Sequence, residues 1–131
     1  MYFILKHPLI KGEFNSADYK DCVRVYGIHY GHFRYIEQIT GSSRRHIGPI
    51  QYEEFSCYRK MDSSTPVIMN ECFAGKPYDC EIIFLDGNSR AILSLNEAIV
   101  CVYHMEVETH TGQVIEFMKI NYTGADFRQI N

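Results

Sequence analysis

The chain has 131 residues, which is enough for one domain with a hydrophobic core and too short for us to expect two. Hydrophobic residues make up 46% of it, and ten Tyr with eight Phe favour a packed, β-rich globule over a disordered chain. The formal net charge of −3 gives no general reason to expect nucleic-acid binding, which usually leaves a basic footprint. No nucleic-acid partner is therefore predicted.

The first residues do not resemble a secretory signal. Lys6, His7 and Pro8 interrupt the few apolar residues at the start, whereas a signal needs a continuous apolar core. No apolar run approaches the ~20 residues that span a bilayer, so membrane insertion is not expected. These observations predict a protein that folds in the cytoplasm without a signal peptide.

In the first half of the chain the pattern predicts three strands and two connections. Residues 2–6 form a short strand and residues 9–18 a polar loop. Residues 22–33 form one long strand with apolar bulk on both faces, which predicts cover from a barrel interior and from a neighbouring subunit. Residues 35–48 have little periodicity and predict an exposed connection that protrudes, and residues 51–60 form the next strand.

The clearest element is a short helix from Ser64 to Ala74. A side-chain oxygen of Ser64 or Thr65 can accept from the free N–H groups of the first turn, and Pro66 stands where its missing N–H costs nothing. Gly75 can adopt the left-handed conformation that ends a helix. Apolar residues recur at helical spacing and are expected to pack: Val67, Ile68, Met69, Cys72 and Phe73.

After the helix the pattern returns to strands. Residues 78–85 form a strand that ends at Asp86-Gly87-Asn88, a strong hairpin signal. The long apolar stretch 91–105 is interrupted at Asn96-Glu97. That interruption predicts either a bulge in one strand or a bend between two.

The end of the chain is expected to hold one turn and one strand. Residues 109–112 form the turn. The polar tail after Thr123 is expected to be loosely held. The apolar residues of the last strand change parity, so a bulge near Met118–Lys119 would reconcile two sets, Ile115 with Phe117 and Ile120 with Tyr122.

The cysteines are spaced irregularly. None forms a CxxC pair, and no histidine stands at a spacing typical of a structural zinc site. An odd number in a chain without a signal favours reduced, buried thiols over a disulfide framework, with a reactive or metal-bound thiol as the alternative. The five are Cys22, Cys57, Cys72, Cys80 and Cys101.

Known catalytic motifs are absent from the sequence. It contains no phosphate-binding glycine loop, no H-E-x-x-H helix and no G-x-S-x-G elbow. His29 and His32 would lie on opposite faces of a strand, which favours solvated or core-edge histidines over metal ligands. Glu106 and Glu108 share a strand face and could act as an acid–base pair, but a solvated strand edge near a turn is the commoner arrangement. No catalytic residue, cofactor or metal is predicted.

One polar segment of the protruding connection is a candidate interaction site. Its arginines and histidine could bind phosphate or the acidic surface of a partner, and the alternative is a solvated loop tip. The segment consists of Gly41, Ser42, Ser43, Arg44, Arg45 and His46.

Three blocks of the chain then stand in a recognisable order. The first block is a short strand, an I-x-G-E turn and a polar loop that leads into a strand. The second is a strand that ends in Lys and Asp before a short Ser-Pro or Thr-Pro helix. The third is the closing strand. Their residues are Ile10, Gly12, Glu13, Tyr19, Val23 and Val25, then Phe55, Lys60, Asp62, Pro66, Cys72, Gly75 and Ile82, then Phe117, Lys119, Ile120 and Tyr122. This order resembles the haemolysin-coregulated protein (Hcp) family, the tube proteins of bacterial type VI secretion systems.

The resemblance implies a mainly β fold, a small closed antiparallel β-barrel flanked by one short α-helix at about residues 64–74, as a single domain over residues 1–131. It implies a structural subunit and not an enzyme. The subunit would form hexameric rings that stack into a tube, with sheath and spike components of the secretion machine as partners and effector proteins held in the pore. The protein would be cytoplasmic when assembled and secreted on firing, and residues 41–46 would help rings stack.

Two other classes of protein remain open. A small-ligand-binding β-barrel would use its Tyr- and Phe-rich interior as a pocket and would be a monomer or dimer. A hydrolase would use Glu106 or Glu108 with a histidine, and it would need a third partner to orient them, which the sequence does not show.

Overall fold

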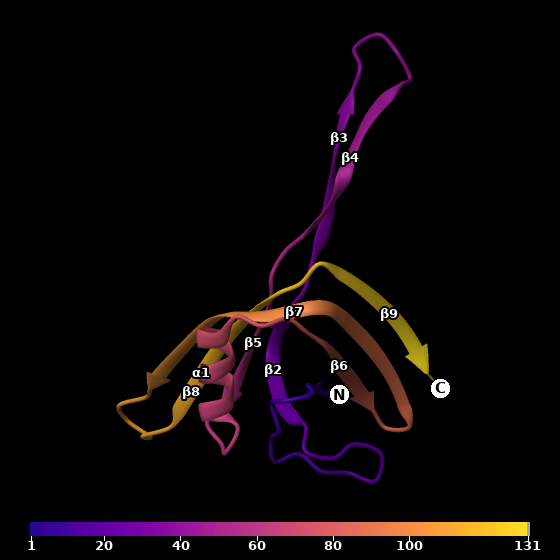
Figure 1. Cartoon of the computed structure of the whole chain (residues 1–131). Helices are drawn as coiled ribbons and strands as arrows, with labels where there is room; N and C mark the ends of the chain where they lie inside the picture. The colour runs from indigo at the N-terminus through magenta and orange to yellow at the C-terminus, as the bar shows by residue number, and fades with distance from the viewer. Residues whose placement is uncertain (131) are drawn as a thin grey trace.

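The computed structural model describes residues 1–130. They form a curved β-structure with one helix beside it and a two-stranded hairpin that projects away from it (Figure 1). The elements are β1 (Tyr2–Lys6), β2 (Val23–His29), β3 (His32–Gln38), β4 (Arg45–Tyr52), β5 (Phe55–Lys60), α1 (Thr65–Ala74), β6 (Tyr78–Asp86), β7 (Ser89–Val107), β8 (Val114–Asn121) and β9 (Gly124–Ile130).

Six strands close into an antiparallel barrel. Their order is β6-β1-β2-β5-β8-β7, and β7 pairs back with β6. Closure removes the free edges through which open sheets aggregate. The prediction of a mainly β fold with a small closed antiparallel barrel and one short helix is confirmed.

The long strand β7 makes this closure possible. Its first half pairs with β6 on one edge and β9 on the other, and its second half pairs with β8. Glu97, at φ 51°, breaks the register between the halves, and its backbone N–H donates to Asp79 Oδ1 over 2.9 Å. The interruption predicted at Asn96-Glu97 is therefore a bulge within one strand. The hairpin predicted at Asp86-Gly87-Asn88 is also confirmed, with Gly87 at φ 61°.

Side chains from every barrel strand fill the interior. Burying a large apolar side chain contributes roughly 1.5–3 kcal/mol, so this cluster supplies much of the fold's stability. Among the fully or almost fully buried residues of the cluster are Leu5, Val25, Phe55, Ile82, Leu95 and Met118.

Helix α1 lies along the barrel and packs against β7. Ile68 is completely buried in the core, and Val67 and Cys72 pack against it. The expected end of the helix is confirmed by Gly75, which adopts a left-handed conformation. Phe73 contradicts the prediction that it packs, because it is 82% exposed.

The predicted strands on either side of the connection are wrong as single elements. The segment 22–33 divides between β2 and β3, and the segment 51–60 divides between β4 and β5. Only one face of β2 is covered within the chain, because Val23 and Val25 are buried while Tyr26 is exposed. Residues 35–48 do protrude, but as paired strands of a hairpin and not as an irregular connection (Figure 1).

The predictions for the end of the chain also need correction. The β8 strand contains no bulge, because the register slips in its partner β7, between Val100 and Val102. The inward positions alternate regularly and begin with a charged residue: Glu116, Met118, Ile120 and Tyr122. The tail after Thr123 is not loose, since it forms β9 and pairs with β7.

Candidate assembly surfaces

The β3–β4 hairpin exposes more apolar surface than a free ribbon is expected to carry. Every residue of β3 is exposed, as are most residues of β4. A two-stranded hairpin is at best marginally stable in water, and exposed apolar patches mark interaction sites. The large apolar residues exposed on it are Phe33, Tyr35, Ile36, Ile39, Ile47 and Ile50.

The register of the hairpin places apolar side chains on both of its faces. Ile36 lies opposite Ile47 on one face. Phe33 and Tyr35 lie on the other, where their rings meet edge to face with centroids 5.2 Å apart. Covering one face would therefore leave the other apolar face in water.

The predicted stacking residues Gly41–His46 gather at the far end of this hairpin. Ser42 orders the turn, because its Oγ accepts from the backbone N–H of Arg44 over 3.0 Å. Arg45 and His46 belong to β4, opposite Gln38 and Glu37. Within residues 1–130, neither Arg44 nor Arg45 has an ion-pair partner. The tip is thus a positively charged surface.

The base of the hairpin is held by polar contacts. His29 Nε2 lies 2.8 Å from Glu53 Oε2, and the Tyr30 hydroxyl lies 2.8 Å from His32 Nδ1. The Tyr122 hydroxyl donates to the Glu53 carbonyl over 2.6 Å. His29 and His32, which the sequence analysis considered as possible metal ligands, therefore contact different side chains, Glu53 and Tyr30.

A buried ion pair joins the barrel to the start of α1. Arg59 of β5 and Glu116 of β8 are cross-strand neighbours, and Arg59 Nη1 donates to Glu116 Oε1 over 3.0 Å. Their side chains are 1% and 0% exposed. Charges removed from water need such partners, since an unpaired buried charge is strongly destabilising.

Hydroxyl groups complete the coordination of this pair. The Thr65 hydroxyl donates to Glu116 Oε1 over 2.8 Å, and the Tyr103 hydroxyl donates to Glu116 Oε2. Burial and then the hydrogen bond and charge of Glu116 raise the pKa of Tyr103. We call the whole network the clasp; its members are Arg59, Asp62, Ser64, Thr65, Tyr103 and Glu116.

The clasp also replaces the helix cap that the sequence predicts. Ser64 makes no side-chain hydrogen bond to the first turn; its Oγ accepts from Arg59 Nη2 over 2.7 Å instead. Asp62 Oδ1 accepts from the backbone N–H of Ser64 over 2.7 Å. Burial alone would raise the pKa of Asp62, but hydrogen bonds from Ser64 and Arg59 hold it below its usual value. The sequence analysis did not predict this network. The available signal was the alternation in β5, which places Arg59 on the same inward face as Phe55.

A row of aromatic rings crosses the outer surface of the barrel from β2 to β7. Neighbouring centroids are 6.1 Å apart between Tyr26 and Tyr58, 5.0 Å between Tyr58 and Phe117, and 6.1 Å between Phe117 and His104. Tyr26 and Tyr58 are 40% and 42% exposed. This row is a second exposed apolar surface, on the flank of the barrel.

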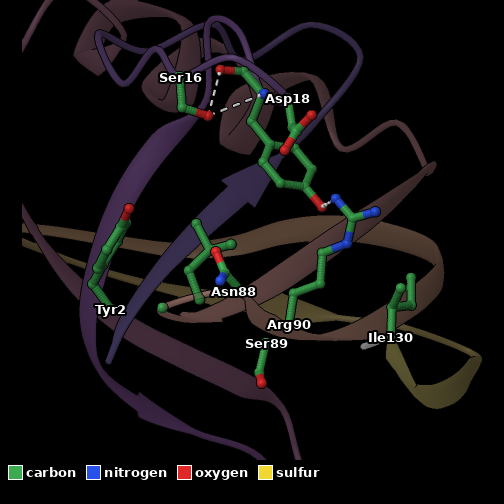
Figure 2. Close-up of a pocket in the computed structure, with 10 residues that line it drawn as sticks. Tyr2, Ser16, Asp18, Asn88, Ser89, Arg90 and Ile130 are labelled. Carbon is green, nitrogen blue, oxygen red and sulfur yellow. Dashed lines mark hydrogen bonds between the residues drawn. The ribbon is translucent and has the colours of Figure 1, made fainter.

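A small polar cleft of about 340 Å³ lies beside the β6–β7 turn (Figure 2). Arg90 crosses it and donates to the Tyr19 hydroxyl over 3.2 Å. Ser16 Oγ accepts from the Tyr19 backbone N–H over 3.2 Å. The cleft's lining includes Ser16, Asp18 and Ser89 but no histidine or cysteine. Its contacts attach the first loop to the barrel.

The structure gives the two glutamates of the hydrolase alternative different surroundings. Glu106 lies beside a hollow that His104 also lines, whereas Glu108 Oε2 accepts from the Thr111 hydroxyl over 3.0 Å in the turn. Within residues 1–130, no group of three His, Cys, Asp or Glu side chains could hold a metal ion. Within residues 1–130, core side chains occupy the barrel interior, where a ligand-binding barrel would have its pocket.

The cysteines are all free thiols, as predicted. Cys22, Cys57 and Cys80 are buried, and burial raises the pKa of Cys57 to about 12. The prediction of burial is wrong for Cys101, which is exposed and whose Sγ donates to Glu54 Oε2 over 2.9 Å. Among residues 1–130, no helix has the length and apolar character needed to cross a bilayer.

A filled barrel with a projecting hairpin defines a small β-barrel protein with an exposed apolar surface. The chain belongs to the Hcp family of type VI secretion proteins: the family model described as "Type VI secretion system effector, Hcp" matches residues 2–128. No protein of curated function matches the sequence.

Solved structures share this fold at low sequence identity. One described as a type six secretion system protein superposes with a TM-score of 0.82 at 14% identity, over 99% of this chain and 91% of that chain. Hcp2 from Salmonella typhimurium gives 0.72 at 13%, over 100% and 95%. A chain of the anti-feeding prophage baseplate gives 0.65 at 10%, over 96% and 91%. At these identities the likeness establishes the fold alone.

Proposed function

We propose that this protein is a tube subunit of a type VI secretion system, in which six copies form a ring and rings stack into the tube. The observation that carries the proposal is the β3–β4 hairpin, which exposes apolar side chains on both faces while the barrel interior is filled. Membership of the Hcp family supports the choice of machine. Residues 1–131 would act as one domain.

The partners follow from this role. Further copies of the chain bind first, sheath and spike components surround and cap the tube, and effector proteins are carried in the pore. The tube would be assembled in the cytoplasm and secreted when the machine fires. The 82% exposure of Phe73 on α1 supports a contact with a neighbouring subunit on that flank.

The residues Gly41, Ser42, Ser43, Arg44, Arg45 and His46 would stack one ring on the next. Their place at the end of a projecting hairpin supports this role (Figure 1), as does the absence of an ion-pair partner for Arg44 and Arg45 within residues 1–130.

The test is the double variant R44E/R45E. We expect native mass spectrometry to show rings as in the parent protein, and negative-stain images to show few tubes, because the hairpin lies outside the barrel core. K20E/K76E is the matched control, since both lysines are exposed and lie outside the hairpin. Normal tubes from R44E/R45E would refute the stacking role. A monomer at high concentration in the parent protein would refute the ring.

A further inference from the structure

A second cleft, of about 390 Å³, opens where the chain leaves β1. Small-ligand sites in proteins typically have volumes of about 300–1,000 Å³, so this cleft is large enough for a small organic molecule. Its lining combines residues of the sheet with residues of the loop that follows β1. They include Lys6, Glu81 and Ser94 from three neighbouring strands, and His7 and Lys11 from the loop.

The buried histidine of this cleft has one ring nitrogen occupied by the backbone. Nδ1 of His7 accepts from the N–H groups of Leu9 and Ile10 over 3.1 and 3.2 Å. A neutral imidazole whose Nδ1 accepts carries its proton on Nε2. Burial, and then the charge of Lys11, lower the pKa of His7 to about 4, so the ring is neutral near pH 7. His7 therefore presents an N–H donor at Nε2.

This donor has no acceptor within residues 1–130. The His7 residue is 4% exposed, and buried polar groups are normally hydrogen-bonded. In the part of the chain that the structure describes, Arg59 Nε is the one side-chain atom that is both fully buried and unpartnered. Nε2 of His7 therefore keeps contact with solvent, and the solvent-filled space that His7 lines is the cleft. Its acceptor must be a molecule in that cleft.

Two ammonium groups lie near this donor. Lys6 directly precedes His7, and Lys11 is close enough for its charge to lower the pKa of His7. Both lysines are exposed, and neither has an ion-pair partner among residues 1–130. Lys6 lies opposite Glu81 in the sheet register, but that carboxylate pairs with Arg128 instead. The two positive charges are thus available to a ligand.

The carboxylates of the cleft already have partners in the chain. Glu81 Oε2 accepts from Arg128 Nη2 over 3.2 Å. Asp79 Oδ1 accepts from the backbone N–H of Glu97 over 2.9 Å. When Arg128 is counted with the two lysines, three positive charges stand against the two carboxylates. The surroundings of His7 Nε2 therefore favour an anion as its acceptor.

The polar cleft beside the β6–β7 turn lacks these features (Figure 2). Its cation, Arg90, donates to the Tyr19 hydroxyl over 3.2 Å and lies 5.8 Å from the centre of the Tyr19 ring. Its lining contains no buried polar side chain. An unpaired positive charge and a buried donor therefore occur together in the cleft at the end of β1 and not in that one.

We propose that the cleft at the end of β1 binds a small organic anion, whose carboxylate or phosphate group accepts from His7 Nε2 and is neutralised by Lys6 and Lys11. Ser94 and Asn96 also line the cleft and can donate to the rest of the ligand. The site lies outside the β3–β4 hairpin and does not depend on the proposed function.

Titration of the full-length protein with inorganic phosphate and with succinate, at constant ionic strength, tests the site. The NMR signals to follow are those of the His7 ring nitrogens and of the Leu9 and Ile10 amides. We expect saturable shifts with at least one anion and none with neutral succinamide, and the tighter anion identifies the group that is recognised. Shifts that never saturate with either anion would overturn the site.

Matched variants make the result specific. K6Q/K11Q removes both charges, and H7N keeps an acceptor near the position of Nδ1 but lacks the Nε2 donor. Each should weaken binding of the anion about tenfold. K20Q/K76Q removes two exposed lysines elsewhere and should bind as the parent does. Urea denaturation checks that each variant is folded, and K6Q/K11Q decides the matter if H7N is not. Undiminished binding in K6Q/K11Q or in folded H7N, or an equal loss in K20Q/K76Q, would refute the proposal.

Discussion

The clasp and the β3–β4 hairpin use similar residues in opposite ways. In the clasp, Arg59 is 1% exposed and donates to Glu116, which is 0% exposed. At the hairpin tip, Arg44 and Arg45 are exposed and have no ion-pair partner within residues 1–130. Tyr103 donates to a buried carboxylate, whereas Tyr35 is 72% exposed.

The difference separates stability from assembly. Charges inside the barrel must be paired within the chain, because no water reaches them. Charged residues on the hairpin can stay unpaired within the chain, because water solvates them. Its apolar residues can stay exposed, because binding of a partner would remove their surface from water. Changes in the clasp should therefore reduce the stability of the fold, and changes in the hairpin should reduce assembly alone.

The largest expected effect on stability is that of E116A. It leaves the Arg59 guanidinium buried without its main partner, so we expect the free energy of unfolding to fall by about 3–5 kcal/mol. Urea denaturation followed by circular dichroism measures this change. A fall below about 1 kcal/mol would show that water or relaxation replaces the carboxylate, and the contrast with the hairpin would weaken.

A paired replacement sharpens the same point. R59M/E116L removes both charges and keeps apolar volume, so it should recover most of the stability lost in E116A. Asp62, Ser64 and Thr65 then lose their common partner, and the start of α1 is expected to loosen. Faster hydrogen exchange at the first turn of α1 would report this effect, whereas unchanged exchange would mean that core packing of Ile68 alone holds the helix.

The next effect concerns pH and the histidine at the end of β1. His7 is 4% exposed, and its Nδ1 accepts from the backbone N–H groups of Leu9 and Ile10 over 3.1 and 3.2 Å. Burial, and then the charge of Lys11, lower the pKa of His7 from 6.5 to about 4. The unfolded chain therefore binds a proton between these values that the folded chain does not bind.

This difference fixes the sign of the pH dependence. The contribution of His7 is fully present above pH 6.5 and is lost as the pH falls toward 4, by about 3 kcal/mol in the free energy of unfolding. H7N keeps an acceptor at the position of Nδ1 but cannot be protonated, so its stability should change less between pH 7 and pH 4.5. Equal pH dependence in both proteins would assign the loss to other groups.

The parts of the fold that could be predicted are those where local chemistry and burial agree. Pro66 and Gly75 correctly predict the ends of α1, and Asp86-Gly87-Asn88 correctly predicts the turn between β6 and β7. The bulge in β8 was misplaced because the prediction grouped Ile115 with Phe117 as one apolar set, whereas Glu116 between them occupies the inward position. Its partner Arg59 comes from a strand distant in sequence, and pairing of that kind is not visible in a local pattern.

The candidate site was predicted in part for the same reason. The polarity of residues 41–46 predicted that they would protrude, but the strands that carry them were missed. A ribbon exposed on both faces has no buried side to impose alternation, so Phe33, Tyr35 and Ile36 follow one another without a period.

The smallest expected effect on stability, and the sharpest test of the comparison, is that of I36S/I47S. The two residues are 54% and 53% exposed and face each other across the hairpin, so removing them should change the free energy of unfolding by less than about 0.5 kcal/mol. If the hairpin is covered by another copy, the same change removes apolar contact and tube formation should fall. The matched control is I68S, which affects a completely buried position of α1 and should instead destabilise the fold. Loss of stability in I36S/I47S would mean that the hairpin packs within its own chain, whereas unchanged tubes would mean that this face stays in water in the assembly.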